Sequence, residues 1–446
     1  MWDGLTPLPW TCTPCQALLR WPEDRSALLL HSGRADHRYA RRSVLASPAG
    51  TLRFEGGPDG QGGTTWRGDT PCPAPLSGHP LADWRAVMRA GPGLWIGYVS
   101  YDVRAWVEPV LRRAGPLWRW PVYEWAWCPS YAVHDTHSGR WQACGDVPEL
   151  AAPREATSVS VTPTPRWSRS TYQAKVQRVC DYIAAGDVFQ VNLAQQLTAP
   201  LHAASRRELR ATYERLATAS PAWYGAYLEL ADDGPTAPRT LLCTSPELFL
   251  EVSADGHVLT RPIKGTLPAD RDPAELRDSD KDAAELAMIV DLLRNDLGRV
   301  CAYGSVRVEE ARAIETHPTI HHGVATVSGQ LHRSRDVWDL LRATLPGGSI
   351  TGAPKVRAMQ IIDELEAGPR GPYCGAIGWI HTTRDRAASA ALNVAIRTIA
   401  ADPAAGRLDL WAGGGIVADS VPGLEYDETL SKAAAMLQAL RPLRSA

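Results

Sequence analysis

Residues 347–366 read "GGSITGAPKVRAMQIIDELE", a glycine-rich turn that leads into a helix-like run. Glycines just before a helix can leave backbone N–H groups free to bind an anion, and the start of a helix favours negative charge. The segment differs from a nucleotide-binding P-loop, because Ala353, Pro354 and Lys355 follow the last glycine where that motif has Lys and then Ser or Thr. A tight turn between a strand and a helix explains the same residues, so both interpretations stay open.

The segments around this turn alternate between strand-like and helix-like patterns. Helical periodicity and end signals predict helices within residues 168–187, 208–219, 278–300, 353–368 and 424–443. In the first of these, Ser170 with Gln173 forms a capping box and Gly186 is a stop signal. Apolar, β-leaning runs predict strands at residues 26–33, 93–102, 122–135, 188–199, 239–252, 257–266, 373–380, 388–399 and 407–417. This mixed order, with many antiparallel neighbours, predicts an α+β fold.

The chain divides into two regions by composition. Residues 1–150 read as strands and turns, and residues 151–166 are rich in Pro, Ser and Thr, which makes them the best candidate for a linker. Residues 167–440 then carry most of the motifs described below. Large mixed enzymes of this length often form one continuous body, so we expect both regions to pack together.

Composition excludes several classes of partner. The 446 residues carry a formal net charge of -2 without a basic run, so we do not expect nucleic acid binding. We see no signal peptide and no apolar stretch of membrane-spanning length, so we expect a cytoplasmic protein with no membrane partner. Nine scattered cysteines argue against a disulfide framework, and Cys12 and Cys15 form a lone pair without the second pair that zinc needs.

Two pairs of acidic residues lie on predicted helices. Asp282 and Glu285 are three residues apart and share a helix face, as do Glu425 and Glu428 near the end of the chain. Two carboxylate pairs without His or Cys at matching spacing suit a hard cation with oxygen ligands, such as Mg²⁺. Spacing alone favours two ordinary charged helix faces over a metal site.

Glycines and histidines mark two further places. Three consecutive glycines, Gly413 to Gly415, destabilise a strand unless a ligand or another chain segment approaches the backbone closely. His317 and His321 have a helical spacing that zinc could use, but Pro318 and β-branched neighbours predict a turn into a strand. A single histidine directed at a substrate, or a core histidine, is the better interpretation.

Lys264 stands in the stretch "RPIKGT", between a Pro-Ile pair and a Gly-Thr pair. Pro262 and Gly265 fix the backbone on both sides, which a solvated surface lysine does not require. A lysine held in a desolvated pocket has a lowered pKa and becomes a nucleophile or a base. A structural lysine paired with a carboxylate is the alternative.

Taken together, these segments resemble the chorismate-utilising enzymes. The similarity runs from about residue 168 to 438 through "RPIKGT", "IVDLLRNDLGRV", "GGSITGAPKVRAMQIIDELE", "YCGAIGWI", "NVAIRT", "AGGGIVADS" and "EYDETLSKA", in the family's order. The family comprises anthranilate synthases, isochorismate and salicylate synthases, and enzymes that form 4-amino-4-deoxychorismate. The resemblance implies two large antiparallel sheets packed as a sandwich, surrounded by helices, with the site in a cleft.

The resemblance also assigns roles to residues of this chain. Glu285 and Glu428 match the family's Mg²⁺ carboxylates, with Asp282 and Glu425 as neighbours that act directly or through water. Magnesium then holds the ring carboxylate of chorismate, and a bidentate arginine suits the second carboxylate. The residues that match substrate-binding positions are Ser349, Tyr373, Arg397, Gly414, Gly415 and Lys432.

Three residues match catalytic positions. Anthranilate synthases typically carry Ala where Lys264 stands, whereas Lys is typical of the enzymes that aminate C4 of chorismate. In those enzymes the lysine is proposed to add to C2 as the C4 hydroxyl leaves, and ammonia then displaces it at C4. Glu247 matches the acid that protonates the leaving hydroxyl, although Leu248 departs from the usual Arg beside it, and His322 matches a histidine near the ring.

The resemblance implies partners as well. No glutaminase segment of the G-x-C-x-G type occurs in the sequence, so ammonia is expected from a glutamine amidotransferase subunit, component II. The stretch "LLLHSGRADH" resembles an N-terminal region that can hold a tryptophan. The alternatives are anthranilate synthase component I, an isochorismate or salicylate synthase, and a non-catalytic tryptophan-binding protein.

Overall fold

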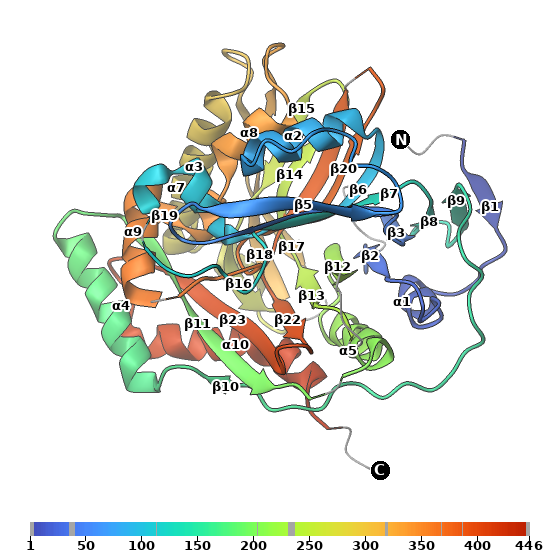
Figure 1. The fold of residues 1–446 in the computed structure, drawn as a ribbon. Coiled ribbons are helices and arrows are strands. Elements are labelled where there is room, and N and C mark those ends of the chain that lie inside the picture. The colour runs from blue at the N-terminus through green and yellow to red at the C-terminus, as the bar shows by residue number, and fades with distance from the viewer. Residues whose placement is uncertain are drawn as a thin grey trace.

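Two large antiparallel sheets form the centre of the protein, as expected for the α+β class (Figure 1). The computed structural model describes residues 4–34, 41–112, 114–202, 204–230, 237–316, 320–366, 368–385 and 387–442. Within these ranges the first sheet has 12 strands and the second has 11. The expected sandwich of two antiparallel sheets is therefore confirmed.

The first sheet combines strands from both ends of the chain. Its strands, in spatial order, are β1 (Thr6–Leu8), β9 (Trp141–Cys144), β8 (Tyr131–Asp135), β3 (Arg42–Ala46), β2 (Leu28–His31), β12 (Tyr224–Glu229), β13 (Thr240–Ser245), β22 (Thr398–Asp402), β23 (Arg407–Ile416), β11 (Gln190–Pro200) and β10 (Thr164–Pro165), with β19 (Gly352–Ala353) paired to β11.

The second sheet likewise combines strands from distant parts of the chain. Its strands, in spatial order, are β16 (Ile263–Pro268), β18 (Ile320–Gln330), β15 (His257–Arg261), β14 (Leu248–Val252), β21 (Ala388–Val394), β20 (Ala376–Thr382), β6 (Gly93–Val99), β7 (Tyr123–Cys128), β4 (Gly50–Gly56) and β5 (Gly62–Gly68), with β17 (Arg307–Thr316) paired to β18. Strands from residues 1–150 therefore lie in both sheets.

Helices cover the outer surfaces of the sheets. They are α1 (Pro14–Leu19), α2 (Pro80–Ala90), α3 (Arg104–Val107), α4 (Arg169–Ala184), α5 (Arg206–Ala219), α6 (Pro273–Arg277), α7 (Asp280–Gly298), α8 (Val337–Thr344), α9 (Lys355–Glu366) and α10 (Pro422–Ala439), with short 3-10 turns η1 (Tyr101–Val103), η2 (Pro109–Leu111) and η3 (Gly348–Ile350). In Figure 1, α5 and α10 lie below β22 and β23, whereas α2 and α8 lie at the opposite side of the molecule.

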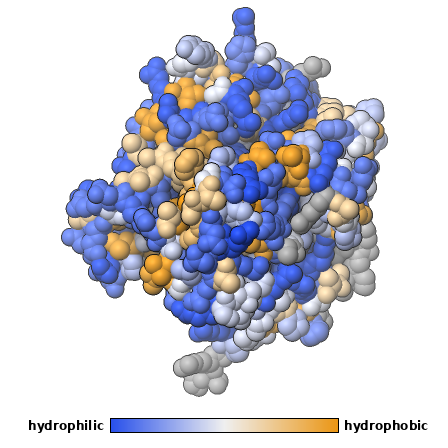
Figure 2. Space-filling view, turned by 90° about the vertical axis from the view of Figure 1, so that its left-hand side faces the viewer, coloured by the Kyte–Doolittle hydropathy of each residue, from blue (hydrophilic) through white to orange (hydrophobic). Residues whose placement is uncertain are grey.

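Two apolar cores follow from this arrangement. The larger core includes residues of both sheets, such as Val44 of β3 and Leu94 of β6, and fills the sandwich. The second core joins one face of the first sheet to α5 and α10, where Leu410 of β23 meets Leu216 and Met436. Figure 2 shows that the face at the left of Figure 1 is mainly hydrophilic, with hydrophobic patches near its centre.

Four predicted strands are each two strands in the structure. Residues 122–135 divide at Pro129, and residues 239–252 divide at Pro246. Each strand ends at its proline, because Pro cannot donate a hydrogen bond to a strand ladder. At both places the chain then passes from one sheet to the other. Residues 257–266 divide at Pro262 inside the second sheet, and residues 388–399 divide before Arg397, again between the sheets.

The cap of α4 and the candidate linker also differ in detail from the sequence predictions. The side chain of Ser168, not Ser170, accepts the capping hydrogen bond of α4, and Gly186 follows its end with a positive φ of 82°. Residues 151–163 contain no helix or strand, but Val159 is buried and its N–H donates to Thr212 of α5. The segment is therefore packed against the body of the protein around Val159, although most of its other residues are exposed.

Candidate active site

A cavity of about 550 Å³ opens where β16, β23, α7 and α10 meet. Of the thirteen residues expected in the site, twelve line this cavity, and the thirteenth, Gly414, lies on the same strand between two that do. The lining residues from that prediction are Glu247, Lys264, Asp282, Glu285, His322, Ser349, Tyr373, Arg397, Gly415, Glu425, Glu428 and Lys432. The fold thus brings together residues that are up to 185 positions apart, from Glu247 to Lys432.

The glycines of β23 lie along a bare strand edge. β11 pairs with β23 along its whole length up to Ile416, but the pairing of β22 with β23 ends at Leu410. Beyond that point, β23 has no strand partner on one side among the described residues, and its backbone groups face the cavity. A Cβ at Gly415 would lie 2.7 Å from Lys264 Nζ, so a larger residue would displace the lysine.

Lys264 is aimed into the cavity by a β-bulge. The pairing of β16 with β18 shifts register between Ile263 and Thr266, and such bulges re-aim side chains beside active sites. Gly265 has a φ of +82°, and a Cβ there would lie 2.7 Å from Leu276, so glycine is required at this position. The residues that flank the lysine in the sequence therefore form the bulge that directs its side chain into the cavity.

The Lys264 ammonium lies in a nearly desolvated place. Its side chain is 11% exposed, and Nζ lies 3.8 Å from Glu285 Oε2 and donates to Gln190 Oε1 at 3.4 Å. Burial lowers the pKa of Lys264, and the Glu285 carboxylate offsets only part of this effect. The amine therefore loses its proton more readily than that of a surface lysine, which gives the neutral, nucleophilic form.

Glu247 lies in the short connection between β13 and β14, 5% exposed. Burial raises the pKa of this carboxyl to about 7, although the hydroxyl of Ser349, which donates to Glu247 Oε1 at 2.6 Å, favours the ionised form. A carboxyl with a pKa near 7 can hold a proton and release it near neutral pH, which is what a general acid needs.

The four acidic residues face the cavity from two helices. The Cβ position of Gly414 lies 3.2 Å from Glu425 Oε2 and 3.5 Å from Glu428 Oε1. Burial raises the pKa of Glu425, and the neighbouring Glu428 raises it further. Burial opposes ionisation of Glu428 as well, but Lys432, at 2.6 Å, holds the pKa of Glu428 below its usual range.

These carboxylates fit Mg²⁺ as donors. In the part of the chain that the structure describes, no three His, Cys, Asp or Glu side chains come together closely enough to hold a metal by themselves. Mg²⁺ commonly uses one or two protein carboxylates and completes its shell with water and substrate oxygens. The crowding of Glu425 and Glu428 is the kind of like-charge contact that a cation relieves.

Arg397 supplies positive charge to the same cavity. It follows β21 with a φ of +50°, a strained conformation for a residue with a side chain. Burial lowers the pKa of Arg397, and no carboxylate among the described residues pairs with its guanidinium. Beside it, the Tyr373 ring stacks on Trp411 with centroids 5.9 Å apart. An unpaired guanidinium in a cavity favours an anionic ligand.

The two described histidines of the histidine cluster point in different directions. His322 lines the cavity, and its Nδ1 lies 3.0 Å from the hydroxyl of Thr266, its register partner across the ladder. His321, its neighbour on β18, bonds Thr316 and does not line the cavity. Adjacent residues of a strand face opposite sides, which explains the difference. His317 lies outside the described residues.

Three residues in or next to the cavity were not predicted. Gln190 holds the Lys264 amine, Asn192 lies two residues further along β11, and Trp411 stacks on Tyr373. The signal for the first two was in the sequence: two amides at spacing i, i+2 share one face of a strand and interrupt an apolar run. Trp411 gave no such signal, because a tryptophan in a strand is ordinary core.

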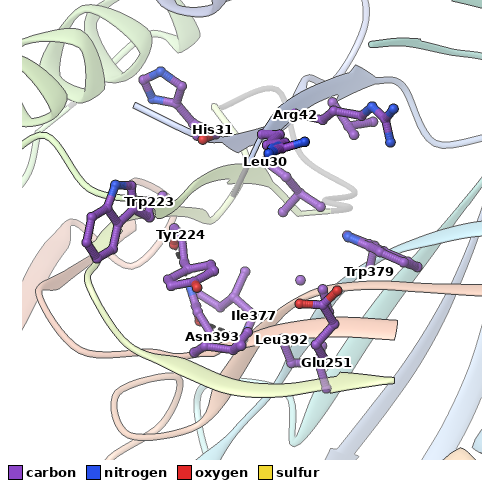
Figure 3. A pocket seen from close by; sticks show the side chains of 17 residues that line it. Leu30, His31, Arg42, Trp223, Tyr224, Glu251, Ile377, Trp379, Leu392 and Asn393 are labelled. Carbon is purple, nitrogen blue, oxygen red and sulfur yellow. Dashed lines mark hydrogen bonds between the residues drawn. The ribbon is translucent and has the colours of Figure 1, made fainter. Parts of the chain in front are cut away.

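A second cavity of about 240 Å³ lies between the sheets (Figure 3). Leu30 and His31 of β2 and Arg42 of β3 form one side, and Glu251 and Trp379 of the second sheet face them. The stretch "LLLHSGRADH" therefore lines this cavity with its first residues, and its residues 35–37 lie outside the described part of the chain.

The α+β fold and the large cavity define an enzyme with a site for an anionic substrate. A family model described as chorismate binding enzyme matches residues 27–438, and the chain belongs to this family. Among the described helices, none is both long enough and apolar enough to cross a bilayer.

Comparison with individual proteins agrees with this family. Aminodeoxychorismate synthase component 1 of Klebsiella aerogenes is 37% identical over 446 aligned residues, which cover 93% of each chain. Anthranilate synthase component 1 of Thermus thermophilus is 41% identical, but over 61% of this chain and 57% of that protein. The crystal structure of anthranilate synthase component I from Streptococcus pneumoniae superposes with a TM-score of 0.75 at 27% identity, covering 97% of this chain and 98% of the other.

Proposed function

We propose that the chain is the chorismate-aminating component of an aminodeoxychorismate synthase. It converts chorismate and ammonia to 4-amino-4-deoxychorismate, which serves para-aminobenzoate and folate synthesis. The observation that carries this proposal is the buried Lys264 amine, held 3.8 Å from Glu285 in the same cavity as the raised-pKa carboxyl of Glu247. The similarity to component 1 proteins along most of the chain supports it.

Charge complementarity explains how the cavity would take a dianionic substrate. The unpaired guanidinium of Arg397, beside Tyr373, would bind the enolpyruvyl carboxylate in a bidentate manner. Glu285 and Glu428, with Asp282 and Glu425 nearby, would hold Mg²⁺, which neutralises the ring carboxylate when bound. The remaining contacts come from Ser349, Lys432 and the backbone at Gly414 and Gly415.

The chemistry follows from the placement of the amine and the acid. The neutral Lys264 amine would add to C2 of the ring while the C4 hydroxyl leaves as water, with its proton supplied by Glu247. Ammonia would then add at C4 while the lysine amine leaves from C2, which moves the ring's two double bonds back to their original positions. His322, buried next to Thr266, would orient the ring.

Ammonia requires a partner in this proposal. No G-x-C-x-G segment occurs in the sequence, and the Klebsiella relative is named a component, so we expect a glutamine amidotransferase subunit to supply ammonia. The second cavity is the place where a tryptophan would bind, since aromatic rings such as Trp223 and Trp379 line it together with a half-buried carboxylate, Glu251, whose pKa is raised by burial. The cytoplasmic location remains a prediction.

The test is product formation by the purified chain. With chorismate, Mg²⁺ and ammonium salt, it should form 4-amino-4-deoxychorismate, identified by mass and ultraviolet spectrum. With glutamine in place of ammonium salt, it should form none until an amidotransferase subunit is added. Glutamate released from glutamine by the chain alone would refute the partner assignment.

Anthranilate synthase component I is the second candidate, since the Thermus relative is 41% identical over the shared region. The same assay separates the two activities, because anthranilate is aromatic and fluorescent and 4-amino-4-deoxychorismate is not. Anthranilate as the main product would overturn the assignment. Lys264 favours the first candidate, since anthranilate synthases typically carry alanine there.

A further inference from the structure

A third cavity, of about 280 Å³, shares Trp411 with the large cavity. Its walls come from residues 118–120, from Arg166 and Gln196 near β10 and β11, from Pro369 and Gly371, and from Arg407 on β23. Apart from Trp411, none of its lining residues belongs to the large cavity. It is therefore a separate compartment next to the proposed chorismate site.

Trp120 is a buried donor at this cavity. It is 5% exposed, and its indole Nε1–H has no hydrogen-bond acceptor in the described part of the chain. Cδ1, the ring atom bonded to Nε1, lies 3.3 Å from the Cβ position of Gly371, which also lines the cavity. Buried donors are almost always satisfied, so an unsatisfied one beside a cavity indicates that a ligand acceptor belongs there.

The arginines of the cavity add positive charge. Arg119 pairs with Asp409 and lies 3.9 Å from Asp402, while Arg407 uses its Nε to bond Asp409 at 2.8 Å. Both aspartates are buried and engaged, so they offer the cavity few free acceptor atoms. For the exposed side chain of Arg166, no acceptor is found among the described residues.

Aromatic rings form the remaining walls, from Trp118, Trp120 and Trp411. We propose that this cavity is a binding site for a small planar carboxylate. Its two oxygens accept hydrogen bonds from Trp120 Nε1 and from the Arg166 guanidinium, and its flat body packs against the indole rings. Inorganic phosphate would satisfy the charges but would leave the aromatic walls without contact, so the cavity favours a carboxylate with a ring.

The size of the cavity agrees with this class of ligand. At about 280 Å³ it has half the volume of the large cavity and accommodates a single ring with one carboxylate. Since Trp411 stacks on Tyr373 in the large cavity, a ligand in the third cavity touches a ring that also borders the proposed substrate site.

The probe for the test is 4-fluorobenzoate, followed by ¹⁹F nuclear magnetic resonance. The large cavity also suits a carboxylate, so the titration uses the full-length Arg397→Ala protein with a chelator present, which removes binding there. In this background we expect saturable binding that depends on Trp120 and Arg166. Trp120→Phe, which keeps the ring and loses the N–H, should weaken binding roughly ten- to a hundredfold, as for loss of one hydrogen bond to a charged group.

Arg166→Gln provides the second variant, because an exposed side chain can be replaced without risk to the fold. It should weaken the probe to a similar degree, whereas Arg294→Gln on the exposed face of α7 should leave binding unchanged. Unchanged binding in Trp120→Phe and in Arg166→Gln would overturn the proposal, and tighter binding of phosphate than of the probe would overturn the assignment to a planar carboxylate. No turnover is measured, so the outcome does not depend on the proposed chorismate reaction.

Discussion

Replacing Lys264 with alanine should separate substrate binding from amination. The Lys264 side chain contributes its amine to the cavity. In the proposed function, Arg397 binds one carboxylate of chorismate, and Mg²⁺ held by Glu285 and Glu428 binds the other. We therefore expect Lys264→Ala to bind chorismate with Mg²⁺ while forming little 4-amino-4-deoxychorismate. Binding and turnover are measured separately, by calorimetry and by product analysis.

The cost to the fold should be small. At 3.8 Å and an effective dielectric constant of about 20, the Coulomb attraction between Lys264 and Glu285 is ~4 kcal/mol. The pKa of Lys264 is nevertheless lowered, which means that desolvation, together with repulsion by Lys432, outweighs the attraction of Glu285, Glu247 and Glu428. Losing the ammonium therefore removes an unfavourable desolvation as well as a favourable pair, and we expect a change in unfolding free energy within about 1 kcal/mol.

The cost to the reaction should be large. Loss of a covalent nucleophile commonly costs several orders of magnitude, and a thousandfold loss of rate corresponds to about 4 kcal/mol. The mutant keeps the acid Glu247 and the substrate contacts, so slow amination at C2 to give anthranilate is the expected residual reaction. Alanine is the residue that anthranilate synthases typically carry at this position.

The assay is chorismate turnover with ammonium salt, with products identified by mass and ultraviolet spectrum. Lys281→Ala serves as the matched control, because Lys281 also lines the cavity and its loss changes the charge by the same amount. Its turnover should fall far less than that of Lys264→Ala. Near-normal output of 4-amino-4-deoxychorismate by Lys264→Ala would refute the nucleophile and leave the lysine a structural role.

Three further predictions concern the metal, the acid and the fold. Glu428→Gln should keep the hydrogen bond from Lys432 and still lose roughly a hundredfold or more of the Mg²⁺-dependent turnover, and full wild-type turnover in excess chelator would contradict the metal assignment. Because Glu247 must be protonated and its pKa is raised to about 7, kcat/KM should fall as pH rises above about 7, and a flat profile between about pH 6 and pH 9 would exclude this role. Glu366→Ala should destabilise the protein by about 3–5 kcal/mol in urea unfolding, because it leaves the buried guanidinium of Arg370 unpaired, whereas the exposed Glu364→Ala should cost less than about 1 kcal/mol.

The element types were largely readable from the sequence, whereas the strand order was not. Apolar runs predicted β23 and β11, and helical spacing predicted α7 and α10, within a few residues of their observed bounds. Membership in one sheet or the other depends on contacts between distant segments, which no local pattern encodes. Pro129 and Pro246 were the available local signals, since both mark crossings between the sheets.

The site was readable to the extent that its residues lie in recognisable motifs. Lys264 stands between a proline and a glycine because a bulge must turn it inward, and that frame is visible in the sequence. Gln190 was missed although it holds the same amine, because its only signal, the i, i+2 spacing with Asn192 on one strand face, belongs to no catalytic motif. The cavity at Trp120 could not be predicted for a similar reason, since its lining residues come from five separate segments.

The close contact between Gly415 and Lys264 links two features that the sequence presents separately. A Cβ at residue 415 would lie 2.7 Å from Lys264 Nζ and 3.0 Å from Gln190 Nε2, so the amine occupies the space that glycine leaves open. The same glycine lies on the bare edge of β23, where its backbone faces the cavity. Under the proposed function Gly415 would therefore serve two purposes, because it would expose the backbone to a substrate carboxylate and it makes room for the lysine. A family member with alanine in place of Lys264 would need the glycine only to expose the backbone. The lysine therefore requires glycine at position 415, whereas glycine at this position does not require the lysine.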